Sequence, residues 1–191
     1  ADVAERIVRE LADLIAEPVP AADLPGVAVL DFANESGDAG TDWLSSGLAE
    51  AVGADLAQGF QVRLIPRAAL VDLKLPPAAA EVPQEVLRSV ASASDARWVA
   101  FGGYRRVGTG LRVRSGYYAA EEDEVKDAGF VEGSWSALFS LQSGTAENLS
   151  RLMALPPREG GEASGLAASS LDAYRAYAEG RRQFCAKGKV S

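Results

Sequence analysis

The fold class is decided by the stretch Val27-Ala28-Val29-Leu30-Asp31-Phe32-Ala33-Asn34-Glu35-Ser36-Gly37-Asp38. Its first half is a short and nearly continuous apolar run, which is typical of a strand buried on both faces. Its second half is a polar loop, and Thr41 or Asp42 can cap the helix that follows. Apolar residues at helical spacing then continue to Gly59: Leu44, Leu48, Ala51, Val52 and Leu56. This strand–loop–helix order predicts an α/β fold.

Downstream patterns extend the same reading. Alternation predicts a strand over 60–65, and helical spacing predicts a short helix over 67–73 and a longer one over 83–93. A strand begins at Trp98, and the Gly108-x-Gly110 turn predicts a hairpin with a returning strand over 111–119. A further strand over 130–134 and a helix within 135–155 follow. We therefore expect a mixed parallel and antiparallel sheet of about five strands with packed helices, plus flanking helices.

Four segments are expected along the chain. Residues 1–26 form an N-terminal helix over 2–16 and a linker rich in Pro, and residues 27–155 form the α/β domain. Residues 156–170 form a second linker by composition. Residues 171–191 begin a last helix, which carries the single cysteine, Cys185.

Composition excludes several classes of function. The 191 residues carry a net charge of −8 with a pI near 4.7, so nucleic acid is not an expected partner. No apolar run approaches the length of a membrane span. The chain starts at Ala1 without Met, so we expect a processed or excised piece, and export stays open.

The chain contains no histidine. This removes the usual general base at neutral pH, the activated Ser or Cys nucleophile, and zinc sites built on imidazole. Catalysis would have to rest on carboxylates, Lys or Tyr, and no paired Asp or Glu motif is identifiable. The sequence therefore predicts a protein that is not an enzyme, with no catalytic residues, no metal site and no cofactor, and a carboxylate-based enzyme is the remote alternative.

The loop 33–42 is the candidate ligand or partner site. It follows a strand and precedes a helix N-terminus, where α/β proteins collect ligands and where free N–H groups favour anions. The expected contacts are Asn34, Ser36, Asp38 and Trp43. The alternative interpretation of the loop is a structural polar turn with Gly37 at positive φ. The alternative interpretation of Trp43, together with Trp98 and Trp135, is an anchor in the core or at its rim.

Two charged groups are given structural interpretations. Glu121 to Glu124 lacks the ligand spacing of a calcium loop and is expected to be a solvated hairpin tip. The arginines at 105, 106, 112 and 114 straddle one hairpin and are expected to balance nearby carboxylates across strands, with an acidic partner as the alternative.

Three stretches together resemble the TolB amino-terminal-like family, which is related to FlgO- and CsgG-type envelope domains. They are residues 27–38 with Gly47-Leu48, the run from Ala96 to Gly108 with its Arg105-Arg106, and Trp135-Ser136-Ala137-Leu138-Phe139-Ser140-Leu141-Gln142. The resemblance covers about residues 27–155. Asp31 departs from it, since the family usually has Pro there, and so does the acidic tip. Residues 170–181 are similar to the segment that leads such domains into tetratricopeptide repeats.

The resemblance implies a regulatory or envelope-associated module with no chemistry assigned to the domain itself. The leading hypothesis is a non-catalytic regulatory or scaffolding module that mediates protein–protein interaction in a larger bacterial signalling or envelope protein. The alternatives are a small-molecule sensor with its ligand at the 33–42 loop, and an envelope structural or secretion-associated component. The expected location is the bacterial periplasm or cell envelope, or else the cytoplasmic part of a signalling protein. Homo-oligomer formation is left open.

Overall fold

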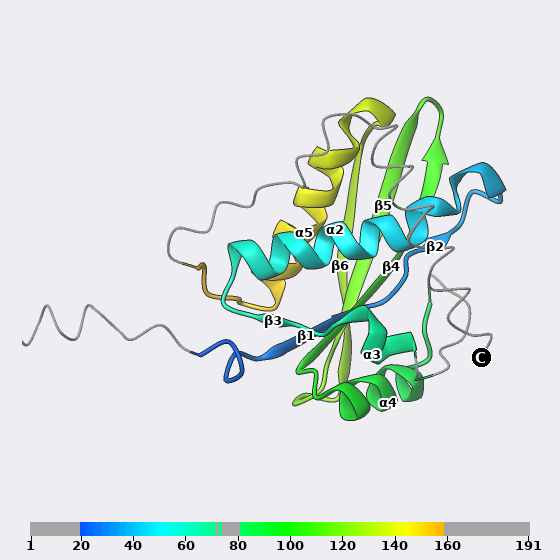
Figure 1. The fold of residues 1–191 in the computed structure, drawn as a ribbon. Coiled ribbons are helices and arrows are strands. Elements are labelled where there is room, and N and C mark those ends of the chain that lie inside the picture. Colours follow the sequence, from blue (N-terminus) through cyan, green and yellow to red (C-terminus); the bar gives the residue numbers. More distant parts are fainter. Residues whose placement is uncertain (1–19, 72, 74–80, 159–191) are drawn as a thin grey trace, which may run out of the picture.

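The computed structural model describes residues 20–71, 73 and 81–158 (Figure 1). The predicted helix over 2–16, the linker from residue 159 onward and the terminal helix with Cys185 lie outside the described residues. The elements in chain order are β1 (Gly26–Val29), β2 (Ala33–Asn34), η1 (Ala39–Thr41), α2 (Trp43–Gly59), β3 (Arg63–Leu64), α3 (Arg67–Val71), α4 (Gln84–Ser94), β4 (Trp98–Val107), β5 (Gly110–Ala119), β6 (Glu124–Ser134), η2 (Trp135–Ala137) and α5 (Leu138–Leu152).

The strands form one mixed sheet. Its order is β3-β1-β4-β5-β6, and β2 pairs with β4 beyond the end of β1. β1 runs parallel to β3 and β4, whereas β4–β5 and β5–β6 are antiparallel pairs. The predicted fold class is therefore confirmed, including the parallel first pairing and the antiparallel hairpins, and the described residues form a sheet of six strands.

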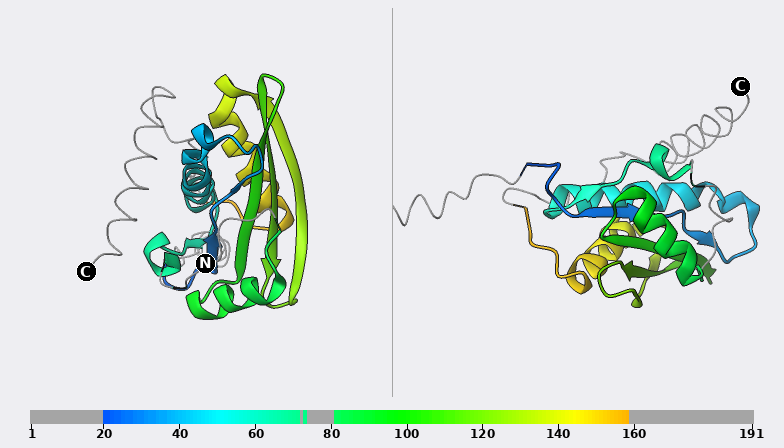
Figure 2. Two further views of the ribbon diagram at one scale, coloured as in Figure 1. Left: turned by 90° about the vertical axis from the view of Figure 1, so that its right-hand side faces the viewer. Right: turned by 90° about the horizontal axis from the view of Figure 1, so that it is seen from below.

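Helices pack on both faces of this sheet. α2 and α5 cover one face, where Leu44, Leu48 and Leu149 are fully buried with strand residues such as Val113. α3 and α4 cover part of the other face, over Leu30, Val99 and Phe101. In Figure 2 the three long strands lie side by side with β6 outermost, and no described element lies beyond β6.

Three predicted boundaries are wrong. The strand expected over 60–65 is reduced to β3, because Phe60 forms an isolated bridge with Pro157 and the Gln61 N–H donates to the Pro156 carbonyl. The first strand ends at Val29, and the polar loop contains β2. The strand expected over 130–134 begins at Glu124, since pairing with β5 overrides the low strand propensity of its charged residues.

Candidate functional site

The predicted loop 33–42 is organised around the amide of Asn34. Its Nδ2 donates to the Asp38 carbonyl at 2.9 Å, to Thr41 Oγ1 at 3.2 Å and to Asp42 Oδ1 at 2.7 Å. Its Oδ1 accepts the Ser36 backbone N–H at 3.0 Å, which is the geometry of an Asx turn. The Asn34 amide is therefore engaged inside the loop.

Asp38 has a similar role one turn later. Its Oδ1 accepts the Gly40 backbone N–H at 2.9 Å and so caps η1, while its Oδ2 lies 3.9 Å from Arg106. Gly37 sits at φ +69°, as a polar turn at this position requires. The structure brings Asn34, Ser36 and Asp38 together, and their polar atoms serve the turn.

Trp43 is separated from these three residues by its orientation. Its side chain is 4% exposed and belongs to the core between the sheet, α2 and α5. It meets Trp135 edge to face, with ring centroids 6.5 Å apart. The predicted helix cap also differs, because Asp42 makes no side-chain bond to α2. Trp43 therefore packs in the core next to the loop and is not a surface contact for a ligand.

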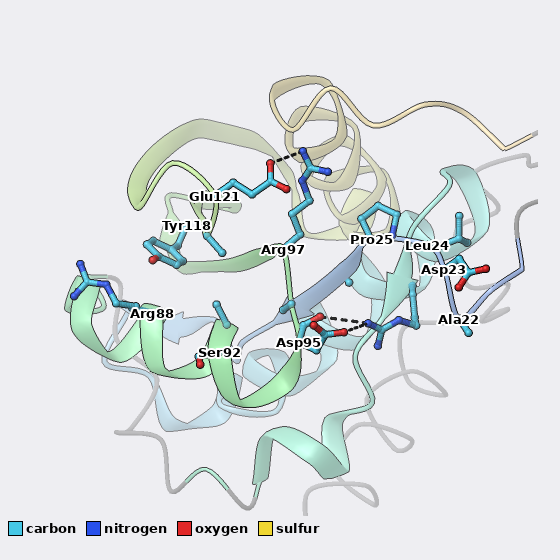
Figure 3. Close-up of a pocket in the computed structure, with 15 residues that line it drawn as sticks. Ala22, Asp23, Leu24, Pro25, Arg88, Ser92, Asp95, Arg97, Tyr118 and Glu121 are labelled. Carbon is cyan, nitrogen blue, oxygen red and sulfur yellow. Dashed lines mark hydrogen bonds and ion pairs between the residues drawn. The ribbon is translucent and has the colours of Figure 1, made fainter.

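A second concave region lies at the opposite end of β1 and is lined by residues from separate segments (Figure 3). The cavity has a volume of about 610 Å³. It lies at the amino ends of β1 and β4, whereas ligands of α/β sheets collect at the carboxyl ends. No local sequence pattern predicts this cavity, since its lining comes from residues 22–26, β3, α4, the 95–97 loop and the end of β5 with the turn that follows it.

The cavity's arginines are paired with carboxylates. Arg63 lies 3.1 Å from Asp95, and Arg97 lies 2.7 Å from Glu121. Figure 3 marks the Arg97–Glu121 pair with a dashed line. Arg88 turns outward to Asp123 at 2.7 Å. An anionic ligand would have to displace these partners, so the cavity is not an open anion site.

Electrostatic coupling is concentrated beside this cavity. Hydrogen bonds from Arg88, then Tyr118 and Gln84, hold the pKa of Asp123 below its usual value of 3.8. Burial raises the pKa of the Tyr118 hydroxyl, which donates to Asp123 Oδ1 at 2.8 Å. The hydrogen bonds behind these pKa shifts connect α4 to the β5–β6 turn, so we interpret them as structural.

The acidic tip is built from ion pairs. Glu121 pairs with Arg97, Glu122 with Lys126, and Asp123 with Arg88. Among the described residues, no cluster of three or more carboxylate, histidine or cysteine side chains is placed to hold a metal ion. Glu124 lies 3.8 Å from Lys126, which it shares with Glu122, so four carboxylates of the tip face three cations.

The sheet face away from α2 and α5 carries an exposed aromatic and basic region that the sequence did not reveal. Beyond the part covered by α3 and α4, Arg112 stacks on Phe130 at 4.6 Å and bonds Glu132 at 2.8 Å. Arg114 lies 3.7 Å from Asp127. These pairs confirm the cross-strand balance expected for both arginines. Arg105 faces Arg112 directly across β4 and β5 and is exposed.

Phe130 is the most exposed large apolar side chain among the described residues, at 57%. Val125 and Leu152 are the other two of this kind, at 39% and 49%. Two of the three therefore lie on β6, the outermost strand of the sheet. We call Val125, Asp127, Phe130 and Glu132, which share one face of this strand, the β6 face.

No protein-family model and no curated protein matches this sequence. Solved structures with a similar chain trace include TolB from Acinetobacter baumannii, at TM-score 0.48 and 17% identity over 70% of this chain. This chain spans 29% of that TolB chain. A PelC dodecamer from Paraburkholderia phytofirmans has TM-score 0.42 and 20% identity, covering 67% of this chain and 87% of its own.

A third similar structure is the lipoprotein GNA1162 from Neisseria meningitidis. It has TM-score 0.46 and 16% identity, covering 69% of this chain and 97% of its own. At these values the similarity concerns the chain trace alone. Among the described helices, none is long and apolar enough to cross a bilayer.

Proposed function

We propose that this chain is a non-catalytic regulatory or scaffolding module of a larger bacterial protein, and that it works by binding another protein. The observation that carries the proposal is the β6 face. The exposed Phe130 lies there under Arg112, with the exposed Val125 on the same face, and aromatic residues and arginine are enriched in the cores of protein–protein interfaces.

The geometry of the other two regions supports this choice over ligand chemistry. The Asn34 amide is engaged in the turn of the 33–42 loop, and Arg63 and Arg97 of the cavity are paired with carboxylates. A small-molecule sensor at the loop would need Asn34 to exchange its internal partners for a ligand. At the β6 face Asp127 and Glu132 are also paired, with Arg114 and Arg112, but the exposed side chains of Val125 and Phe130 can be covered without breaking these pairs.

The domain plan and the location belong to the same proposal. We propose that residues 27–155 form a TolB amino-terminal-like domain between two linkers, with a tetratricopeptide-like helix starting near 171. The support is the ordered set of sequence stretches that resemble that family. The same resemblance supports a place in the bacterial periplasm or cell envelope, with an envelope structural component and a cytoplasmic signalling protein as the alternatives.

Site-specific photocrosslinking in the host cell tests the proposal. A photoreactive amino acid at Phe130 is compared with one at Gln58, which is exposed on α2. We expect a discrete protein adduct from the Phe130 position that is absent from the Gln58 position. Equal labelling at both positions, or none at either, would contradict the proposal.

A further inference from the structure

The β6 face borders a free sheet edge. β6 is 11 residues long and pairs with β5 on one side, and no described strand pairs with it on the other. The opposite edge of the sheet is β3, which has two residues. An outermost strand presents a row of backbone N–H and C=O groups that another strand can pair with. β6 is thus the longer free edge, and a bulge at Gly129, whose N–H donates to Asp127 Oδ1 at 3.0 Å, divides its pairing with β5 into 124–127 and 130–134.

The side chains of the β6 face indicate which residues an added strand should carry. Along the strand, apolar and acidic residues alternate: Val125, Asp127, Phe130 and Glu132. A strand added beyond β6 would place its side chains directly opposite these residues, where opposite charges and apolar pairs stabilise the sheet. Basic residues would face the carboxylates of Asp127 and Glu132, which would then lie between this base and the β5 arginine that each already pairs with, and apolar residues would face Val125 and Phe130.

β5, which pairs with β6 on its other side, already shows this pattern of contacts. Arg112 pairs with Glu132 at 2.7 Å while stacking on Phe130, and Tyr118 stands opposite Val125. An added strand with alternating basic and apolar residues would repeat this arrangement on the free side. Phe130 is 57% exposed, so its outer surface is available for such a contact.

The opposite face of the edge offers a second apolar contact. Leu152, at the end of α5, is 49% exposed. Its carbonyl accepts the Tyr117 hydroxyl at 2.9 Å, and Tyr117 is the partner of Lys126 in the β5–β6 ladder. Leu152 is therefore an exposed apolar residue on the α5 side of the sheet, near the β5–β6 ladder.

A second copy of the chain fits this edge poorly. β6 carries Glu124, Asp127 and Glu132 against the single base Lys126, so two such strands would repel each other. Charged residues on an edge are a common protection against self-pairing. That protection excludes an identical strand and admits a basic one.

We propose that the β6 edge binds an extended segment of a partner protein by strand addition, and that the segment alternates basic with apolar residues. This inference rests on the proposed function and adds its mode and its partner chemistry.

The test uses the purified 191-residue chain and the capped peptide Val-Thr-Lys-Thr-Val-Thr-Lys-Thr-Val. N-methylation at either the odd or the even residues blocks one backbone edge of the peptide and leaves the protein unchanged. We expect one series to abolish binding and the other to retain it, because a strand presents alternate N–H groups to opposite sides. Hydrogen exchange should slow within residues 124–134 when the peptide binds.

Two further measurements test the contributions of peptide charge and of the Phe130 side chain to binding. The peptide with Glu in place of Lys should bind more weakly, and added salt should reduce the difference. Phe130→Ala should weaken binding roughly two- to fivefold, as the loss of one cross-strand pair predicts, whereas Gln58→Ala should not.

Three results would overturn strand addition. They are equal binding of both N-methylated series, no binding at about 1 mM peptide, and self-association of the chain with residues 124–134 protected in the absence of peptide. A crosslink at Phe130 together with equal binding of both series would leave protein interaction standing and remove only its proposed mode.

Discussion

Arg88 on α4 and Asp123 in the β5–β6 turn form a two-pronged ion pair, with Nη2 2.7 Å from Oδ2 and Nε 3.0 Å from Oδ1. Gln84 and Tyr118 donate to the same carboxylate. Asp123 has φ +53°, a left-handed conformation that Asp and Asn adopt more readily than most residues. One exposed carboxylate thus fixes the turn that leads into β6.

Asp123→Asn should lower the stability of the domain at neutral pH, because the amide keeps the turn but loses the charge that Arg88 pairs with. The folded-state pKa of Asp123 is lowered, so the charge contributes stability above the ordinary value of 3.8 that is lost as the pH falls toward the folded pKa. Urea unfolding as a function of pH checks this. The gap between the two proteins should close in acid, and Glu124→Gln should show a smaller effect. A gap that stays constant with pH would contradict the electrostatic explanation.

Asp55 is a buried carboxylate between α2 and α5. It is 1% exposed, Ser143 Oγ donates to its Oδ2 at 2.9 Å, and its Oδ1 has no hydrogen-bond partner. Burial raises the pKa of Asp55, against the hydrogen bond from Ser143, which lowers it. The folded state therefore holds a proton more tightly than the unfolded state, and stability falls as the pH rises from about 3.8 through the folded pKa.

Asp55→Asn should therefore stabilise the domain at neutral pH by roughly 1 kcal/mol or more, since an unpaired buried charge is removed. The gain should shrink in acid, where the native carboxyl is already protonated. Denaturant melts at neutral and acidic pH measure both effects. Ser143→Ala is the matched control and should destabilise, because it leaves the carboxylate with no donor. A stabilisation independent of pH would rule out the titration of Asp55 as its cause.

Asn34→Ala should cost about 1–3 kcal/mol, the usual cost of leaving polar groups without their internal partners. Asn34→Asp should cost at least as much, because it replaces a donor by a carboxylate beside Asp42 Oδ1, which lies 2.7 Å from the native Nδ2. Ser36→Ala, where the turn uses the backbone N–H, should stay within about 0.5 kcal/mol. Chemical denaturation of the three variants decides the matter. If Asn34→Ala were neutral, the loop's polar network would be available for ligands after all.

The elements that the sequence predicted well are those whose signal is local. The apolar run at Val27, the helical stripe of α2 and the Gly108 turn each depend on neighbouring residues, and each is present. β6 was foreseen in its second half alone. Its acidic first half is held as strand by pairing with β5, and that information is not contained in the segment itself.

The candidate site was harder to foresee for the same reason. Loop composition correctly indicated a polar turn, but the inward direction of Trp43 follows from its distant partner Trp135. The cavity and the β6 face are assembled from segments far apart in sequence. Exposure at an edge depends on which strand is outermost, and strand order cannot be derived from periodicity.

Gly102 on β4 lies where a side chain would have no room between β5 and Phe32. An added Cβ would stand 2.2 Å from the Arg114 carbonyl oxygen and 2.7 Å from the Phe32 ring. Gly102→Ala should therefore destabilise by about 3 kcal/mol or more, since the backbone of β5 must shift. Trimming the ring in a Gly102→Ala, Phe32→Leu double variant should not restore stability, because the carbonyl oxygen remains.

Gly144→Ala on α5 is the control. The nearest neighbour of its added Cβ would be Val131 at 3.3 Å, and the gain in helix propensity should keep the change in stability near zero. Thermal melts of the three variants compare them, and rescue by Phe32→Leu would mean that the ring, and not the β5 backbone, requires glycine at this position.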